Sequence, residues 1–514
     1  RMCLVEQGMP PRLAPGATPT YNEDGYQSIQ WMPRAVIACA NTVAENMGIR
    51  TDGKLCTEAR RGVLEFLLTN HPLDCPICDQ AGEGKLQEYT TDYGSGTHRF
   101  TESKTKKGKN LSVGPRVNLD QERCVLCRRC VRFMKEIVGD PVLGVVGRGT
   151  HSRITCYPGR ELDSNYSMNV VDLCPVGALT SKDFRFKMRV WFLKSTPTID
   201  INCGTGTNIN IWTREQQVYR ITPRQNDEVN SCWMPDSHRL NYKYINAPER
   251  LLHPLVKTDI GAQQRPSTWD ATINLIAEQL HKCAPAEMAL IFSARMTNEE
   301  IYMVRALARQ LGITKYDFVA RTGESDNMLI SEDRNPNSTG AKLITGKTGS
   351  GLATIRRGVR NGSIRSLIVL GEDVTAEAGF TEEDLSGLDY LLVMHHSENA
   401  TTKAADVVLP GVTFAEKYGT MVNVCGRIQR LNKAIEPLGE ARSDWDIMRE
   451  LTQALGCDCP RVIACPSPMI ILEEIAAEID AFNGLTWGSI GNEGKVITET
   501  GVTIPLIERE KAKK

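Results

Sequence analysis

The sequence lacks several features by which common classes of protein are recognised. It contains no run of about 18 apolar residues, so no membrane-spanning helix is expected. Basic residues are not in excess, because 61 Lys and Arg oppose 62 Asp and Glu for a net charge of −1, and this balance argues against a nucleic-acid-binding protein. The first six residues show no signal-peptide pattern. A protein of this kind that works at a membrane would therefore lie on it.

Motifs of the commonest enzyme sites are also absent. No Ser, His and Asp arrangement indicates nucleophilic catalysis, and no G-x-G-x-x-G sequence follows a strand to indicate dinucleotide binding. The chain of 514 residues is too long for one domain, and its length alone predicts three or four.

Cysteine, in contrast, is abundant and unevenly placed. Ten of the 17 cysteines lie in the first 174 residues, several of them in C-x2-C pairs. Such clusters in a long chain indicate a reducing compartment and metal ligation. Disulfides are the alternative, although the sulfurs of adjacent C-x2-C pairs rarely bond to each other in stable structures.

The strongest motif is a set of four cysteines: Cys124, Cys127, Cys130 and Cys174. The first three follow one another at two-residue intervals and can reach three corners of a cubane, while a distant Cys-Pro supplies the fourth. Soft thiolates select iron–sulfur clusters or zinc, and this spacing favours a [4Fe–4S] cluster over zinc. Three neighbouring arginines are expected to offset the negative charge of the cluster and favour its reduction: Arg123, Arg128 and Arg129.

A second ligand set combines His71 with Cys75 and Cys78. It follows an apolar helical stretch over residues 63–68, which Pro72 is expected to end. A lone histidine is more often a packed or exposed residue than a ligand. Its position four residues before a C-x2-C pair makes His71 a candidate ligand.

The C-terminal half alternates between apolar strands and amphipathic helices. Thr297 and Glu300 form a capping box at the start of one helix, and Gly312 is placed to end it. This alternation predicts a parallel sheet with helices on both faces. The expected strands are 288–292, 366–370, 390–394 and 406–409. Two short stretches before them, 199–202 and 208–212, alternate apolar and polar residues and also read as strands. The polar stretch 102–109 is expected to cross solvent between modules.

The motifs occur in the same order in the large iron–sulfur subunit of respiratory complex I (NADH–quinone oxidoreductase), which the whole chain resembles. The resemblance is carried by residues 1–6, 38–40, 71–80 and 124–130, and by 405–420, which resembles molybdopterin oxidoreductases. It implies a multidomain α+β and α/β protein. The implied domains are a partial [2Fe–2S] ferredoxin-type domain (1–45), a His/Cys iron–sulfur domain (46–110), a [4Fe–4S] ferredoxin-like domain (111–192), a degenerate cluster-binding domain (193–250) and a molybdopterin-oxidoreductase-like domain (251–514).

The resemblance also assigns ligands. Cys3 and Cys39 correspond to the last two ligands of a [2Fe–2S] cluster whose other two are expected upstream of Arg1. The fourth ligand of the His71 site falls on Gly84, which has no ligating side chain. Three outcomes remain open there: another group or solvent completes a [4Fe–4S] cluster, a three-iron cluster forms, or the site is a relic.

A further cluster site of the family is expected to be lost. Cys203 remains, but Thr207 and Pro235 stand where the family has ligands. No residue of the C-terminal half is a convincing molybdenum ligand, so no molybdenum is expected, although the fold alone does not establish function.

The function that the resemblance implies is electron relay. Electrons would pass from a flavin-bearing, NADH-oxidising subunit to a quinone-side iron–sulfur subunit, and the chain would have no catalytic residues of its own. It would be a peripheral subunit on the cytoplasmic face of a bacterial inner membrane, or on the matrix side in a mitochondrion. The alternatives are a subunit of a formate dehydrogenase or NAD-linked hydrogenase, or a purely structural protein.

Overall fold

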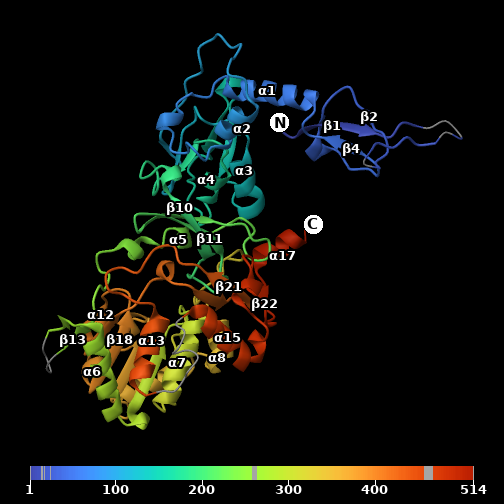
Figure 1. Ribbon diagram of the computed structural model, residues 1–514. Coiled ribbons are helices and arrows are strands. Elements are labelled where there is room, and N and C mark those ends of the chain that lie inside the picture. Colours follow the sequence, from blue (N-terminus) through green and yellow to red (C-terminus); the bar gives the residue numbers. More distant parts are fainter. Residues whose placement is uncertain are drawn as a thin grey trace. The chain divides into compact units, whose positions relative to one another are not determined.

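The computed structural model describes residues 2–12, 16, 18–23, 25–257, 263–456 and 467–512. The chain divides into two compact units, Arg1–Phe192 and Leu193–Lys514 (Figure 1). The first unit mixes short strands and helices, and the second is built on a largely parallel sheet with helices. This is the predicted fold class. Among the described residues, no helix is long and apolar enough to cross a membrane.

The first unit consists of short elements joined by long loops. At its N-terminal end β1 pairs with β2, β3 and β4. Two further sheets, β5-β6-β9 and β7-β8, surround the cysteine-rich segment. The strands are β1 Leu4–Met9, β2 Gln30–Trp31, β3 Val36–Ile37, β4 Gly48–Arg50, β5 Leu111–Ser112, β6 Val117–Leu119, β7 Leu143–Val146, β8 Arg153–Cys156 and β9 Leu179–Ser181, and the α-helices are α1 Lys54–Leu68, α2 Lys85–Tyr93, α3 Arg129–Arg132 and α4 Asn169–Leu173.

The polar stretch 102–109 differs in part from its prediction. It is anchored within the first unit, because Lys104 Nζ donates to the carbonyls of Leu68 and Thr69 at 2.7 and 2.9 Å. Lys107 Nζ donates to Ser152 O at 2.8 Å. The stretch is largely exposed, as predicted, but two of its lysines bind carbonyl groups that lie far away in the sequence.

The second unit is built on a seven-stranded sheet with the order β14-β13-β19-β18-β17-β15-β16. The five strands from β15 to β19 are parallel, and β13 and β14 add an antiparallel edge. The predicted strands at 288–292 and 366–370 are confirmed without change. The strands of this sheet are β13 Leu255–Val256, β14 Arg265–Pro266, β15 Met288–Phe292, β16 Tyr316–Phe318, β17 Ser366–Leu370, β18 Tyr390–His395 and β19 Val407–Pro410.

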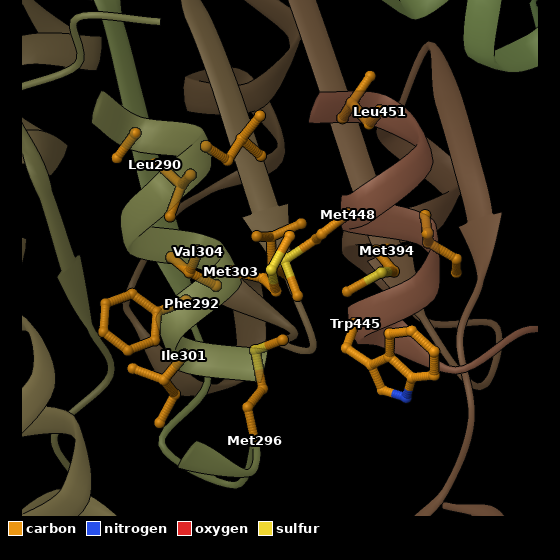
Figure 2. Packing of buried hydrophobic residues seen from close by; sticks show 14 of the residues in the cluster. Leu290, Phe292, Met296, Ile301, Met303, Val304, Met394, Trp445, Met448 and Leu451 are labelled. Atoms are coloured by element: carbon orange, nitrogen blue, oxygen red, sulfur yellow. The ribbon is translucent and has the colours of Figure 1, made fainter. Parts of the chain in front are cut away.

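Helices cover both faces of this sheet, as predicted. Alternate strand residues, such as Leu290 and Phe292, face one apolar cluster with α6, α7, α8, α13 and α15 (Figure 2). Their neighbours Ala289 and Ile291 face a second cluster with α9, α10 and α11. The helices of the unit are α5 Asp236–Arg239, α6 Trp269–Lys282, α7 Asn298–Gln310, α8 Ser338–Thr345, α9 Leu352–Arg360, α10 Val374–Glu377, α11 Glu382–Ser386, α12 Ala400–Ala404, α13 Asp444–Ala454, α15 Pro468–Glu478, α16 Trp487–Ile490 and α17 Pro505–Lys511.

The residues at the two ends of α7 have the predicted geometry. Thr297 and Glu300 form a reciprocal capping box, and Gly312, just beyond the helix, has a φ of +62°. Glycine adopts this left-handed conformation at little cost in free energy, because it has no Cβ atom.

Two three-stranded sheets complete the second unit. One consists of β10 Lys194–Ile199, β11 Asn208–Arg214 and β12 Gln217–Pro223, and the other of β20 Gly419–Val422, β21 Arg427–Leu431 and β22 Lys495–Val496. The alternating stretch at 208–212 lies in β11 as predicted. The stretch at 199–202 does not form a strand beyond Ile199, because Asp200 and Asn202 bond to each other in a loop.

Candidate iron–sulfur centres

The loop that carries Cys124, Cys127 and Cys130 has an unusual backbone. Leu126 and Arg128 have positive φ values of +53° and +63°, and Leu126 N donates to Cys124 Sγ at 3.4 Å. Non-glycine residues in this conformation cost free energy and are concentrated at functional sites. The turn that the cysteine spacing predicted is therefore held in a strained, ligand-presenting form.

All four predicted cysteines of this set line one small cavity. Cys130 comes from α3, and Cys174 follows the last residue of α4. Apolar side chains complete much of the wall, and Arg128 and Arg129 are also among the lining residues. The residues lining the cavity are Leu119, Cys124, Val125, Cys127, Arg128, Arg129, Cys130, Ile154, Cys174, Pro175, Val176, Ala178 and Leu179.

Burial opposes the ionisation of two of these thiols. Burial, reinforced by the neighbouring thiolates, raises the pKa of Cys130 to about 12, and burial raises the pKa of Cys174 to about 11. Four thiolates in this place need positive charge to be stable, and bound iron ions would supply it. Among the described residues, no three His, Cys, Asp or Glu side chains converge on a point where one metal ion could sit. The thiols are grouped around a shared cavity.

His71, Cys75 and Cys78 lie in a separate loop of the same unit. The Nδ1 atom of His71 is buried and has no hydrogen-bond partner. Burial lowers the pKa of this imidazole, which favours the neutral form that can ligate a metal. Cys75 begins a 3-10 turn, Cys75–Ile77, and Cys78 N donates to Cys75 O at 3.1 Å. An imidazole nitrogen without a partner, in the same loop as the two cysteines, is compatible with the predicted ligand set.

Gly84 is buried and directly precedes α2. Its φ of −76° is one that any residue can adopt, and a Cβ atom there would lie 3.2 Å from Gln80 O. A Cβ atom at this position would therefore require the neighbouring carbonyl to move by only a few tenths of an ångström.

The two ligand loops touch each other. A Cβ atom on Gly177 would lie 2.3 Å from Cys78 Sγ, so this thiol packs against the glycine backbone that follows Cys174. Gln80 Nε2 donates to Cys174 O at 3.2 Å. The structure brings the His71 and Cys124 sites into direct contact, which their separation in the sequence did not indicate.

Arg123 is not among the residues that line the four-cysteine cavity. Its side chain binds Asp74, in the other ligand loop, at 2.7 Å. Neither Asp74 nor this contact was identified from the sequence. The only sequence feature that could have indicated the contact is that two residues of opposite charge each directly precede a proposed ligand cysteine.

Cys3 and Cys39 are brought together by the pairing of β1 with β3. Their sulfur atoms lie 3.7 Å apart, and both residues are exposed. The hydrogen bond between them raises the pKa of Cys39. A tetrahedral metal with metal–sulfur bonds of about 2.3 Å places two thiolates about 3.8 Å apart. The pair is therefore spaced to share one metal ion.

Among the described residues around Cys203, no set of metal-ligating side chains comes together. Cys203 is fully buried, its Sγ faces Leu329 O at 3.7 Å, and burial raises its pKa to about 11. Thr207, at a predicted lost ligand position, has a buried hydroxyl without a partner. Pro235 caps α5.

A polar cavity lies at the carboxyl ends of the parallel strands in the second unit. It is lined by residues at or beyond the ends of β15, β17 and β18, including Arg295, Glu372, His395 and His396, and none of its lining residues is a cysteine. This edge of an α/β sheet is where ligands commonly bind.

Four family models match the chain. They are described as the NADH-ubiquinone oxidoreductase-G iron-sulfur binding region (60–99), the ferredoxin-like domain of NADH-quinone oxidoreductase subunit 3 (114–180), the NDSU1/NuoG-like 4Fe-4S domain of NADH-ubiquinone oxidoreductase (193–243) and molybdopterin oxidoreductase (335–454). Iron–sulfur-binding domains are thus present, followed by a molybdopterin-oxidoreductase domain.

Curated relatives extend this similarity over most of the chain. The mitochondrial NADH-ubiquinone oxidoreductase 78 kDa subunit of Candida albicans is 31% identical, and the alignment covers 84% of this chain and 76% of that subunit. The NADH-ubiquinone oxidoreductase 75 kDa subunit of Reclinomonas americana is also 31% identical, with coverages of 90% and 82%. A solved NAD+-reducing [NiFe]-hydrogenase is 25% identical over 37% of this chain and 71% of the hydrogenase chain, with a TM-score of 0.29. The chain belongs to the family of the large iron–sulfur subunit of NADH–quinone oxidoreductase, respiratory complex I.

Proposed function

We propose that this chain relays electrons through iron–sulfur clusters within an NADH–quinone oxidoreductase. The observation that carries the proposal is the single cavity lined by Cys124, Cys127, Cys130 and Cys174, next to a second ligand loop. These residues would hold a [4Fe–4S] cluster, which when bound accepts and releases single electrons.

The chain's own residues set the conditions for this transfer. The four thiols provide the ligands, and Leu119, Ile154 and Leu179 limit the access of water to the cavity. Arg128 and Arg129 bring positive charge to its lining, which favours the reduced state. No residue of the chain is assigned a catalytic role, since the chemistry belongs to the bound groups.

A second site is proposed at His71, Cys75 and Cys78. The orphaned Nδ1 of His71 supports ligation, and Gly84 leaves one iron of a cubane without a protein ligand from the family position. Cys3 and Cys39 are proposed to hold one iron of a [2Fe–2S] cluster, which their 3.7 Å sulfur separation supports.

The relatives' names support membership of a multi-subunit enzyme. We propose that electrons enter from the NADH-oxidising flavin subunit and leave for a quinone-side iron–sulfur subunit. The chain would lie in the peripheral arm, on the cytoplasmic side of a bacterial membrane or on the mitochondrial matrix side. The division into five domains at residues 45, 110, 192 and 250 is part of the same proposal.

The relay is tested by removing one ligand. Cys127→Ala should abolish one [4Fe–4S] signal in EPR spectra of the reduced, anaerobically purified protein. Cys156→Ala is the matched control, because Cys156 lies in β8 outside the ligand cavity and its thiol bonds to Val113 O. Retention of every signal in Cys127→Ala would overturn the assignment.

A further inference from the structure

One buried ion pair joins the two ligand loops. Arg123 directly precedes Cys124, and Asp74 directly precedes Cys75. The guanidinium donates to both carboxylate oxygens of Asp74, from Nη2 at 2.7 Å and from Nε at 3.2 Å. Only 5% of the Arg123 side chain and 20% of the Asp74 side chain are exposed. A two-pronged Arg–carboxylate bond of this kind fixes both distance and orientation.

The same arginine lies beside a ligand of the second site. The position of a Cβ atom on Gly177 is 2.3 Å from Cys78 Sγ and 3.6 Å from Arg123 Cδ, so these two atoms are at most about 6 Å apart. The main chain of Arg123 thus belongs to one ligand loop while its side chain lies against the other.

The surroundings of the ion pair are acidic. Asp120 lies 3.5 Å from Arg123 Nη1, and Lys109 bonds to Asp74, Asp120 and Glu122 at 3.7, 3.4 and 2.8 Å. An arginine guanidinium paired with carboxylates in this way keeps its proton, since arginine is effectively always charged in proteins. The guanidinium therefore stays charged.

We infer that Arg123 is a positioning residue for electron transfer: it fixes the two ligand loops to each other, and its charge raises the reduction potential of the His71 site. The charge near an iron–sulfur cluster is one of the factors that set its potential, and a nearby cation favours the more negative, reduced form. Asp74 moderates this effect because it neutralises part of the charge. The inference rests on the proposed function, since it requires a reducible cluster at His71, Cys75 and Cys78.

Two substitutions that break the same bond separate this role from a merely structural one. Arg123→Met removes a positive charge and should lower the midpoint potential of the His71 site. Asp74→Asn removes a negative charge and should raise it. A structural role would instead shift both in one direction, because both variants lose the 2.7 Å contact. The double variant should lie between the two single variants.

The measurement is an EPR-monitored redox titration of the assembled enzyme containing each variant. Arg123→Lys keeps the charge and should keep a potential close to that of the wild type. Arg99→Met is the matched control, because Arg99 binds Glu65 with the same two-pronged geometry but has 85% of its side chain exposed. It should cause no shift.

Each outcome decides the inference. Shifts in the same direction, or no shift in either single variant, overturn it. If Arg123→Met does not retain its cluster, the upward shift of Asp74→Asn and the wild-type potential of Arg123→Lys decide in its place. A wild-type enzyme with no signal from the His71 site overturns that part of the proposed function as well, whereas intact signals with shifts of the wrong sign overturn this inference alone.

Discussion

The two units of the chain are stabilised in different ways. The second unit has a seven-stranded sheet whose alternate residues enter apolar clusters on its two faces, one of which is shown in Figure 2. The first unit has strands of two to six residues, and its cysteine-rich segment surrounds a cavity bordered by thiols. From this comparison we expect hydrophobic burial to supply most of the stability of the second unit. We expect the first unit to depend more on the groups that its cysteines are proposed to bind.

Removal of iron should have the largest effect, and it should be confined to the first unit. Binding of a structural metal contributes folding free energy, about 10–16 kcal/mol in zinc-finger peptides, so we expect a loss of at least several kcal/mol. Hydrogen exchange before and after anaerobic chelation measures it. Peptides from 111–192 should lose protection while peptides from 366–409 keep it. Equal protection of 111–192 in both samples would remove the contrast between the units.

Breaking a buried ion pair of the second unit should destabilise that unit and leave the first unit intact. Glu416 binds Arg250 at 2.7 Å, and both side chains are 1% exposed. Glu416→Ala leaves the arginine charge buried without its partner and should cost about 3–5 kcal/mol of unfolding free energy. Denaturant unfolding monitored in this unit measures the loss, and the EPR signals should persist. Glu278→Ala, which breaks the exposed Lys282 pair, should cost less than about 1 kcal/mol.

Gly84→Cys should have a smaller effect of the opposite sign. The new thiol would supply the fourth ligand at the family position, and the backbone there accepts a side chain. Iron content of the isolated chain should rise, and the cluster at His71 should resist oxidation for longer. Equal iron and identical EPR spectra under the same reducing conditions would mean that Gly84 is not a vacant ligand position.

The smallest expected effect is none at all. Supplying molybdate or tungstate during expression should leave no such metal in the purified protein, because the cavity at the carboxyl edge of the second unit's sheet has no cysteine in its lining. Elemental analysis measures it. About one molybdenum or tungsten per chain would contradict the expectation that the second unit retains the fold without the metal.

The sequence was most informative where a pattern is local. The spacing of Cys124, Cys127 and Cys130 predicted a common site, and the apolar stretches predicted β15 and β17 with their bounds. The cysteine at 174 needed only its Cys-Pro context. These features depend on neighbours within a few residues, so a single sequence carries them.

Contacts between distant segments could not be read in the same way. The 102–109 stretch looks like a solvated linker because its lysines are polar, yet their partners lie about 15 to 45 residues away. Arg123 was assigned to the cysteines that follow it, whereas its side chain meets Asp74, 49 residues earlier. Composition and periodicity do not determine which distant group an arginine or lysine will reach.

The contact at Gly177 bears on how an electron could tunnel through this protein. A ligand sulfur of one loop rests on the main chain only three residues beyond Cys174, a ligand of the other. Covalent bonds carry tunnelling electrons better than gaps do, so residues 174–177 would provide a mostly bonded route between the two proposed sites. A Cβ atom on Gly177 would lie 2.3 Å from Cys78 Sγ, so even an alanine there would force the two loops apart and lengthen that route.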